Sequence, residues 1–128
     1  MVTGLVLVAD DEEPFRAALA RLLAAAGYRV ETACDGEAAL AVLRAHRPAC
    51  AVLDAMLAGR DGYDLCRAAR CDPALAGMRI VLTSPRGRAV DKEKARALGA
   101  DAMLTKPFGF RDLEAALAMP MRDGEGRR

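Results

Sequence analysis

Short apolar runs alternate with segments of helical periodicity along this chain, and this alternation limits the folds that it can adopt. Most of the runs are continuously apolar and rich in Val, Leu and Ile, which is typical of strands covered on both faces. One run alternates apolar and polar residues instead. The predicted strands are Gly4–Ala9, Tyr28–Ala33, Ala49–Asp54, Arg79–Thr83 and Ala102–Thr105.

The segments between these runs predict helices. In the first segment, Pro14 suits a first turn, Gly27 suits the end, and Phe15, Leu19, Leu22 and Leu23 recur at helical spacing. The predicted helices are Glu12–Ala26, a helix that Asp35 caps and that reaches about His46, Tyr63–Arg70, Arg88–Leu98 and Phe110–Met119. Because strand and helix alternate strictly, we expect an α/β domain, with a doubly wound parallel sheet and helices on both faces.

The composition fits a single globular domain. The chain has 128 residues, of which 53% are hydrophobic and 29% charged, and this balance excludes a disordered chain. We assign residues 1–120 to the domain and 121–128 to a flexible tail or the start of a linker. The net charge of only +1 offers no field for nucleic acid, so we expect no direct nucleic-acid binding.

Neither a membrane nor a disulfide framework is expected. No apolar run approaches the ~18 residues of a membrane helix, and no basic segment leads the chain, which predicts a cytoplasmic protein. Cys34, Cys50, Cys66 and Cys71 form no Cys-x-x-Cys pair, so we expect buried thiols. The one histidine, His46, lies among arginines and is not expected to bind metal.

Polar residues follow the predicted strands at one end. Asp10 and Asp11 come after the first strand, Asp54 ends the third, Thr83 ends the fourth, and Lys106 follows the fifth. The carboxyl ends of parallel strands share one edge of the sheet, so these side chains should meet there. Taken singly, each has an ordinary structural role as a cap, a strand end or a solvated charge.

Such a cluster of carboxylates predicts a cation. Two carboxylates within ~4 Å repel by about 4 kcal/mol at an effective dielectric near 20. Oxygen ligands with room for water suit Mg2+, and a carboxylate beside that ion can attack a phosphoryl group to form an acyl phosphate. Asp54 is the candidate nucleophile, and Lys106 and Thr83 could stabilise the transferring oxygens.

Four segments in this order resemble the response-regulator receiver domain of two-component signalling. They are LVLVADDEE, VLDAMLAGRDGYDLC, IVLTS and GADAMLTKPF, and the resemblance extends from about Leu5 to Met119. It implies a flavodoxin-like sheet of five strands in the order 2-1-3-4-5, flanked by five helices. It also implies that Asp54 is the phosphoacceptor, that Lys106 contacts the phosphoryl group and that Thr83 is the switch hydroxyl.

The resemblance further implies a magnesium site. Asp11 and Asp54 would bind Mg2+ directly, Asp10 mainly through water, and the backbone carbonyl of Met56 would complete the protein ligands.

Two features around this site are expected to shape the backbone. The resemblance implies a cis peptide between Lys106 and Pro107. Asp61 follows the phosphoacceptor loop, and we expect it to cap the third helix.

The chain also departs from the family pattern. Met103 stands where an aromatic switch residue is common, so we expect a weaker rearrangement of the fifth strand on activation. Ala58 replaces a proline in the phosphoacceptor loop. The resemblance implies that the residues at the positions of Met56 and Pro85 influence attack by water on the acyl phosphate. Neither side chain here can orient that water molecule, which predicts slow self-dephosphorylation.

The expected partners are a histidine kinase or histidine phosphotransfer protein and a downstream effector. Kinase recognition is assigned to the surface of the first helix, with Phe15, Ala18 and Leu19 as candidates. Family members with winged-helix output domains often form a symmetric dimer through charge pairs. Ala102 and Ala116 stand where two of those charges are expected, which argues against this dimer, and the oligomeric state stays open. A charged surface remains for another partner, although a solvated face is the favoured interpretation of any single one of its charges. These residues are Lys92, Lys94, Arg96, Asp101 and Arg111.

Other function classes fit less well. A phosphate-independent binding module of the same shape is the main alternative. An aspartate-dependent phosphatase would want a second carboxylate where Met56 stands, so no enzyme is expected beyond self-phosphorylation and slow self-dephosphorylation of Asp54. A nucleotide-binding protein would need a glycine-rich loop where ADDEEP stands.

Overall fold

A computed structural model describes residues 4–118 and confirms the alternation of strands and helices. The strands are β1 (Leu5–Ala9), β2 (Arg29–Ala33), β3 (Cys50–Asp54), β4 (Arg79–Ser84) and β5 (Ala102–Thr105). The helices are α1 (Glu13–Ala25), α2 (Gly36–His46), α3 (Gly62–Arg70), α4 (Ala89–Ala97) and α5 (Phe110–Leu117). The predicted final residue of the last helix, Met119, and the predicted tail at 121–128 lie outside the described residues.

All the strands are parallel, and their order is β2-β1-β3-β4-β5, as the resemblance implied. The chain moves outward from β1 to β2 and then crosses to the other side of β1 to form β3. The order therefore reverses between β1 and β3, where Ala9 lies opposite Leu53. In parallel α/β sheets a ligand site forms at the carboxyl ends of the strands beside this reversal.

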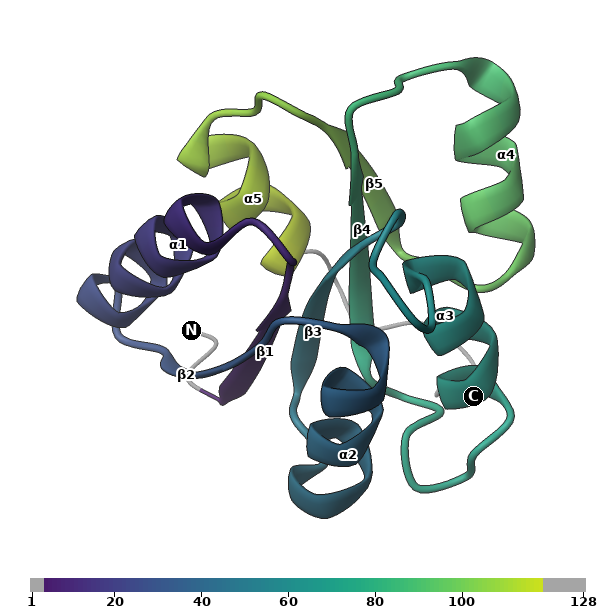
Figure 1. Cartoon of the computed structure of the whole chain (residues 1–128), viewed down its shortest axis with the longest axis horizontal. Helices are drawn as coiled ribbons and strands as arrows, with labels where there is room; N and C mark the ends of the chain where they lie inside the picture. The colour runs from purple at the N-terminus through teal and green to yellow at the C-terminus, as the bar shows by residue number, and fades with distance from the viewer. Residues whose placement is uncertain (1–3, 119–128) are drawn as a thin grey trace.

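Helices cover both faces of the sheet (Figure 1): α1 and α5 lie on one face, and α2, α3 and α4 on the other. Along β1, Val6 and Val8 pack toward α1 and α5, while Leu7 and Ala9 pack into the opposite core. Burial on both faces explains why the central strands are continuously apolar. None of the helices within residues 4–118 combines the length and apolar character of a membrane span.

Two aspartates begin helices next to the carboxyl edge of the sheet. The Asp35 carboxylate accepts from the Ala38 amide at 2.8 Å, and the Asp61 carboxylate accepts from the Asp64 amide at 2.9 Å. Both caps were predicted and both are confirmed. They fix the starts of α2 and α3, which flank the end of β3.

A glycine brings α3 close to the end of β3. A Cβ atom on Gly62 would lie 2.6 Å from the Asp54 carbonyl oxygen and 3.0 Å from the Ala55 Cα atom. Only glycine leaves room for this approach of one backbone to another. Gly62 therefore helps to fix the backbone that carries Asp54.

Two predictions about α1 are wrong. Leu19, a candidate for partner recognition, is only 4% exposed and belongs to the core beneath α1. Leu22, which was expected in the apolar stripe, is 49% exposed. The sequence shows helical spacing here but not where the edge of the buried face lies, because the face is set by how α1 sits on the sheet.

The prediction of buried thiols holds for half of the cysteines. Cys50 and Cys66 are buried in the two cores, whereas Cys34 and Cys71 are exposed at the ends of β2 and α3. All of them are free thiols.

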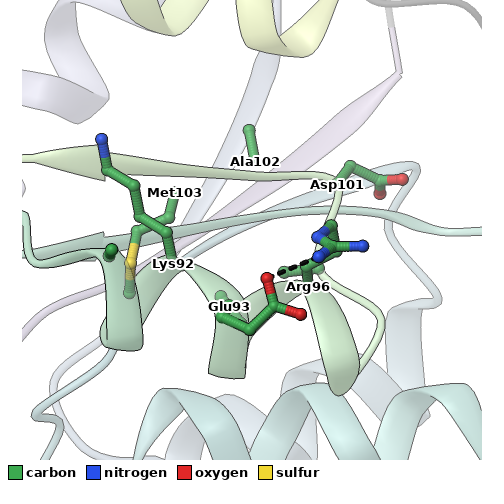
Figure 2. A pocket seen from close by; sticks show the side chains of 9 residues that line it. Lys92, Glu93, Arg96, Asp101, Ala102 and Met103 are labelled. Carbon is green, nitrogen blue, oxygen red and sulfur yellow. Dashed lines mark hydrogen bonds and ion pairs between the residues drawn. The ribbon is translucent and has the colours of Figure 1, made fainter.

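A cavity of about 390 Å³ lies between α4 and β5. Figure 2 shows side chains that line it, among them Ala102 and Met103. Asp101 borders this cavity, but its carboxylate is not the free surface charge that was expected. It accepts from the Arg70 guanidinium at 3.0 Å and from the Ile80 amide at 2.8 Å, and its side chain is 6% exposed. The assignment of Asp101 to a partner surface is therefore wrong, because the residue joins α3 to β4 and β5.

Candidate functional site

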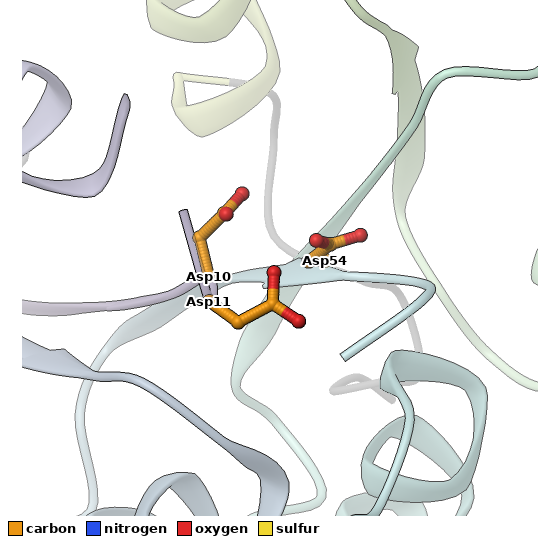
Figure 3. A group of neighbouring side chains, drawn as sticks. All are labelled: Asp10, Asp11 and Asp54. Atoms are coloured by element: carbon orange, nitrogen blue, oxygen red, sulfur yellow. The ribbon is translucent and has the colours of Figure 1, made fainter. Parts of the chain in front are cut away.

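Three aspartates meet at the carboxyl edge of the sheet (Figure 3). Asp10 and Asp11 follow β1 and Asp54 ends the neighbouring β3, so one carboxylate oxygen from each lies within 4.8 Å of the others. Asp10 and Asp54 are buried, at 1% and 5% exposure, while Asp11 is exposed. The structure thus brings together the acidic residues that were predicted from the strand ends.

Lys106, just after β5, supplies a cation to this cluster. Its ammonium donates to Asp10 Oδ2 at 2.8 Å and lies 3.6 Å from Asp54 Oδ2 and 3.8 Å from Glu12 Oε1. The peptide that joins Lys106 to Pro107 is cis, as the resemblance implied. One ammonium faces several carboxylates, so the site keeps an excess of negative charge.

Backbone amides hold the other oxygen of each buried carboxylate. The Glu12 amide donates to Asp10 Oδ1 at 2.8 Å, and the Met56 amide donates to Asp54 Oδ1 at 2.9 Å. In both aspartates the Oδ2 atom is the one that faces Lys106. Asp54 is thereby oriented with one oxygen fixed by its own loop and the other directed into the cluster.

Thr83 lies beside Asp54 on the neighbouring strand. The two residues are register partners in the β3–β4 pair, the Ala55 amide donates to the Thr83 carbonyl at 2.8 Å, and Thr83 is 1% exposed. The next carbonyl, that of Ser84, accepts from the Lys106 amide at 2.7 Å. The predicted hydroxyl and the predicted ammonium are therefore positioned by one continuous stretch of β4.

The electrostatic environment opposes ionisation of Asp54. Burial raises the pKa of Asp54, and the charges of Asp10 and Asp11 raise it further, whereas the Met56 amide and Lys106 act in the opposite direction. Burial lowers the pKa of Lys106, but the hydrogen bond to Asp10 and the charges of Asp54 and Asp10 outweigh it, so that pKa is raised overall. A further cation would relieve this excess charge.

The donor set matches the preferences of a hard divalent cation. Carboxylate oxygens from Asp10, Asp11 and Asp54 are close enough to share one ion, and Mg2+ typically takes one or two carboxylates and completes its shell with water. Met56 is 55% exposed, and its contact with the site is through its backbone, whose amide donates to Asp54 Oδ1.

Three residues of the site were not found by sequence reasoning. The Arg16 guanidinium donates to the Asp10 carbonyl at 2.8 Å, and Glu12 joins the acidic group around Lys106. The Phe15 ring lies 4.6 Å below the Lys106 ammonium, as a cation–π contact. Phe15 was expected to serve partner recognition, and its position on the first turn of α1 was the available signal for a role in the site.

Phe15 is held by a second ring. Its centroid lies 5.9 Å from that of Phe108, in an edge-to-face arrangement, and both side chains pack against the core beneath α1 and α5. The two aromatic residues therefore close the side of the site that faces these helices.

A second cavity, of about 400 Å³, opens between the β3–α3 loop and α4. Its lining includes Met56, two residues after Asp54, and Ser84 and Arg86 at and beyond the end of β4. Farther along, the Lys94 ammonium lies 4.2 Å from the centre of the Tyr63 ring. The loops that follow β3 and β4 thus border this cavity, and the loop after β3 also contacts the acidic cluster through the Met56 amide.

The chain is similar to a known family over nearly all of its described length. A family model described as the response regulator receiver domain matches residues 6–118. The transcriptional regulatory protein AfsQ1 of Streptomyces coelicolor is 38% identical over 120 residues, which cover 94% of this chain and 52% of that protein. The probable transcriptional regulator ycf27 of Cyanophora paradoxa is 36% identical over 120 residues, covering 94% of this chain and 49% of that protein. The chain therefore spans about half the length of these relatives.

Solved structures share the fold. The chemotaxis response regulator CheY4 of Vibrio cholerae superposes with a TM-score of 0.84 at 28% identity, covering 90% of this chain and 99% of that chain. A response regulator from Burkholderia pseudomallei, solved with a phosphorylated aspartic acid, a calcium ion and citrate, gives a TM-score of 0.82 at 29% identity. That match covers 90% of this chain and 66% of the other.

Proposed function

Because the chain belongs to the family of response regulator receiver domains, we propose that Asp54 accepts a phosphoryl group in a reaction that requires Mg2+. The observation that carries this proposal is the meeting of Asp10, Asp11 and Asp54 around one ammonium, that of Lys106. A partly buried cluster with this excess of negative charge is suited to a divalent cation and to a phosphorylated side chain that the cation accompanies.

The metal ligands would be Asp11 and Asp54 directly, Asp10 mainly through water, and the Met56 carbonyl. When bound, Mg2+ would neutralise charge on the phosphoryl oxygens and reduce the repulsion among the carboxylates. Asp10 keeps a second duty, because its Oδ2 holds the Lys106 ammonium in place.

Asp54 Oδ2 is the atom that would attack phosphorus, since Oδ1 is occupied by the Met56 amide. A bond forms between this oxygen and phosphorus while the bond from phosphorus to the donor nitrogen breaks, and that nitrogen keeps the electron pair and takes up a proton. The Lys106 ammonium would stabilise charge on the transferring oxygens, and the Thr83 hydroxyl would donate to one of them.

The donor would be a histidine kinase or a histidine phosphotransfer protein, and the recipient of the signal a downstream effector. The phosphorylated aspartic acid named for the Burkholderia pseudomallei regulator supports an aspartate as the acceptor. Relatives named as transcriptional regulators are about twice as long as this chain, which supports an effector outside it. We assign any contact with nucleic acid to the effector.

The signal would pass from Thr83 along the sheet to the cavity in Figure 2. Leu82, which precedes Thr83, is the register partner of Met103, and Met103 both packs on the core and lines that cavity. Because methionine is flexible, the rearrangement of β5 would be weaker than with an aromatic residue. Nearly unchanged amide spectra of residues 81–96 after phosphorylation would contradict this.

No turnover of a separate substrate is proposed. Neither Met56 nor Pro85 carries a group that could orient a water molecule, so self-dephosphorylation of Asp54 should be slow. A lifetime of the phosphorylated chain shorter than that of ordinary receiver domains, at matched Mg2+ and pH, would overturn this expectation.

Intact mass spectrometry tests the proposal. With Mg2+ and phosphoramidate as a small donor, the wild-type chain should gain one phosphoryl adduct and Asp54→Asn should gain none. Asp61→Asn is the matched control, because asparagine caps a helix as well as aspartate does and the adduct should persist. If the wild-type chain gains no adduct, the alternative of a phosphate-independent binding module replaces the proposal.

A further inference from the structure

Gly87, in the loop between β4 and α4, lies against the side chain of Thr105, the last residue of β5. A Cβ atom on Gly87 would lie 2.6 Å from Thr105 Oγ1 and 3.3 Å from Thr105 Cγ2. Gly87 is not among the residues with positive φ, so its backbone conformation is open to other amino acids. Space, and not conformation, is the reason for glycine at this position.

The same loop is tied to β5 through Ser84. Ser84 is the register partner of Thr105, its carbonyl accepts from the Lys106 amide at 2.7 Å, and its hydroxyl accepts from the Arg86 amide at 3.0 Å. The helix that follows begins after Arg88, whose guanidinium donates to Asp91 within the helix at 2.8 and 3.1 Å. Between Ser84 and Arg88, the close approach of Gly87 to Thr105 is the contact that joins the loop to the side chain of β5.

A loop displaced from Thr105 would disturb the site at two points. The hydrogen bond from the Lys106 amide to Ser84 would lengthen, and this bond anchors the backbone of the residue whose ammonium reaches Asp54 at 3.6 Å. Ser84 and Arg86 would also move in the wall of the cavity that Met56 lines.

We propose that Gly87 and Thr105 are positioning residues for phosphoryl transfer to Asp54, because their close contact seats the β4–α4 loop on β5 and so fixes Lys106. The inference rests on the proposed function. Neither residue touches the reacting atoms, so each acts through Ser84 and Lys106.

A double-mutant cycle tests the contact. Gly87→Ala introduces the clash, Thr105→Ala removes the Oγ1 and Cγ2 atoms that cause it, and Thr105→Val keeps the bulk without the hydroxyl. At saturating Mg2+ and phosphoramidate, Gly87→Ala should lower the phosphorylation rate constant about threefold or more relative to wild type. In the Thr105→Ala background the same glycine substitution should have almost no effect, and Gly87→Ala/Thr105→Val should stay slow.

Mg2+ affinity and amide exchange separate positioning from general loss of structure. Mg2+ affinity should be unchanged in Gly87→Ala, while hydrogen exchange of the Lys106 amide should accelerate and return to its original rate when Thr105→Ala is added. Unchanged rate and exchange in Gly87→Ala, or no recovery in the double variant, would overturn the inference. If the wild-type chain takes up no phosphoryl group, the proposed function fails and the positioning role with it, and amide exchange still reports whether the contact holds the loop.

Discussion

The Lys106 ammonium donates to Asp10 Oδ2 at 2.8 Å, although the two residues are 96 positions apart in the chain. The Lys106 side chain is 16% exposed and that of Asp10 only 2%, so this ion pair is largely removed from water. Asp10 therefore has a partner in the absence of any metal, whereas the negative charge of Asp11 and Asp54 is only partly balanced. This imbalance leads to the first two predictions.

Asp54→Asn should stabilise the metal-free chain at neutral pH. An acid whose pKa is raised by folding binds its proton more tightly in the folded chain, so its ionisation lowers stability. This loss is absent at pH values below the ordinary pKa of aspartate and complete above the raised pKa. The melting temperature of Asp54→Asn should thus exceed that of wild type by a few degrees at pH 7, where ~1 kcal/mol corresponds to about 4 °C, and the gap should close on acidification.

Asp61→Asn is the control for this comparison, because its carboxylate caps α3 outside the cluster. Its melting temperature should follow that of wild type at every pH. Adding Mg2+ should stabilise wild type and Asp61→Asn but have less effect on Asp54→Asn. A metal-free Asp54→Asn chain that melts below wild type at pH 7 would contradict the account of repulsion.

Lys106→Met should destabilise the metal-free chain by about 3 kcal/mol, because it leaves the buried carboxylate of Asp10 without its cation. Mg2+ should restore more stability to this variant than to wild type, while phosphorylation of Asp54 should remain slow. Urea denaturation with and without Mg2+ provides the measurement. Lys92→Met, an exposed change on α4, should show neither effect, and equal Mg2+ stabilisation of both variants would argue against a shared role of Lys106 and the metal.

Gly62→Ala should destabilise the fold by about 2 kcal/mol, since the new Cβ atom would lie 2.6 Å from the Asp54 carbonyl oxygen and force the backbone apart. Gly77→Ala is a matched control, because a Cβ atom there meets nothing within 4 Å, and it should be neutral or slightly stabilising. Thermal unfolding of the two variants checks the pair. Equal stability of the two would show that α3 does not need its close approach to β3.

Arg70→Met should cost about 3 kcal/mol, because it removes the Arg70 guanidinium from the Asp101 carboxylate, which is only 6% exposed, and breaks a largely buried ion pair. Arg70 also donates to the carbonyls of Gly99 and Met78, which precede β5 and β4, so the starts of both strands depend on it. Arg67→Met is the control, since Arg67 is 65% exposed and its ion pair should contribute little. If chemical denaturation gives the two variants equal free energies of unfolding, the Arg70–Asp101 pair contributes no more than a surface ion pair.

The sequence predicts the sheet and the acidic cluster well, for a physical reason. Parallel strands buried on both faces are continuously apolar, and their carboxyl ends must share one edge, so Asp10 and Asp54 could be brought together from their positions alone. The caps at Asp35 and Asp61 were predicted for a different reason, because each acts over only three residues of the chain. These features depend on residues that are close in the chain or on a rule of topology.

What was missed depends on packing between distant segments. Leu19 and Leu22 are equally apolar, and only the orientation of α1 on the sheet decides that Leu19 is buried and Leu22 exposed. From the sequence, Asp101 is interpreted as a surface charge, and only the structure shows that the Arg70 guanidinium donates to it. From the sequence, Phe15 is interpreted as a partner contact, and only the structure shows that the loop after β5 places Lys106 over its ring. In each case the deciding partner is far away in the sequence.

The most direct test of the central claim is to locate the phosphoryl group and its dependence on metal. After reaction with phosphoramidate, borohydride reduction converts an aspartyl phosphate to homoserine, and tandem mass spectrometry finds its position. We expect homoserine at position 54 only, in the presence of Mg2+ and not in the presence of a chelator. Homoserine at another aspartate, or equal conversion at position 54 without Mg2+, would contradict the proposal that the carboxylate cluster recruits a cation for phosphorylation of Asp54.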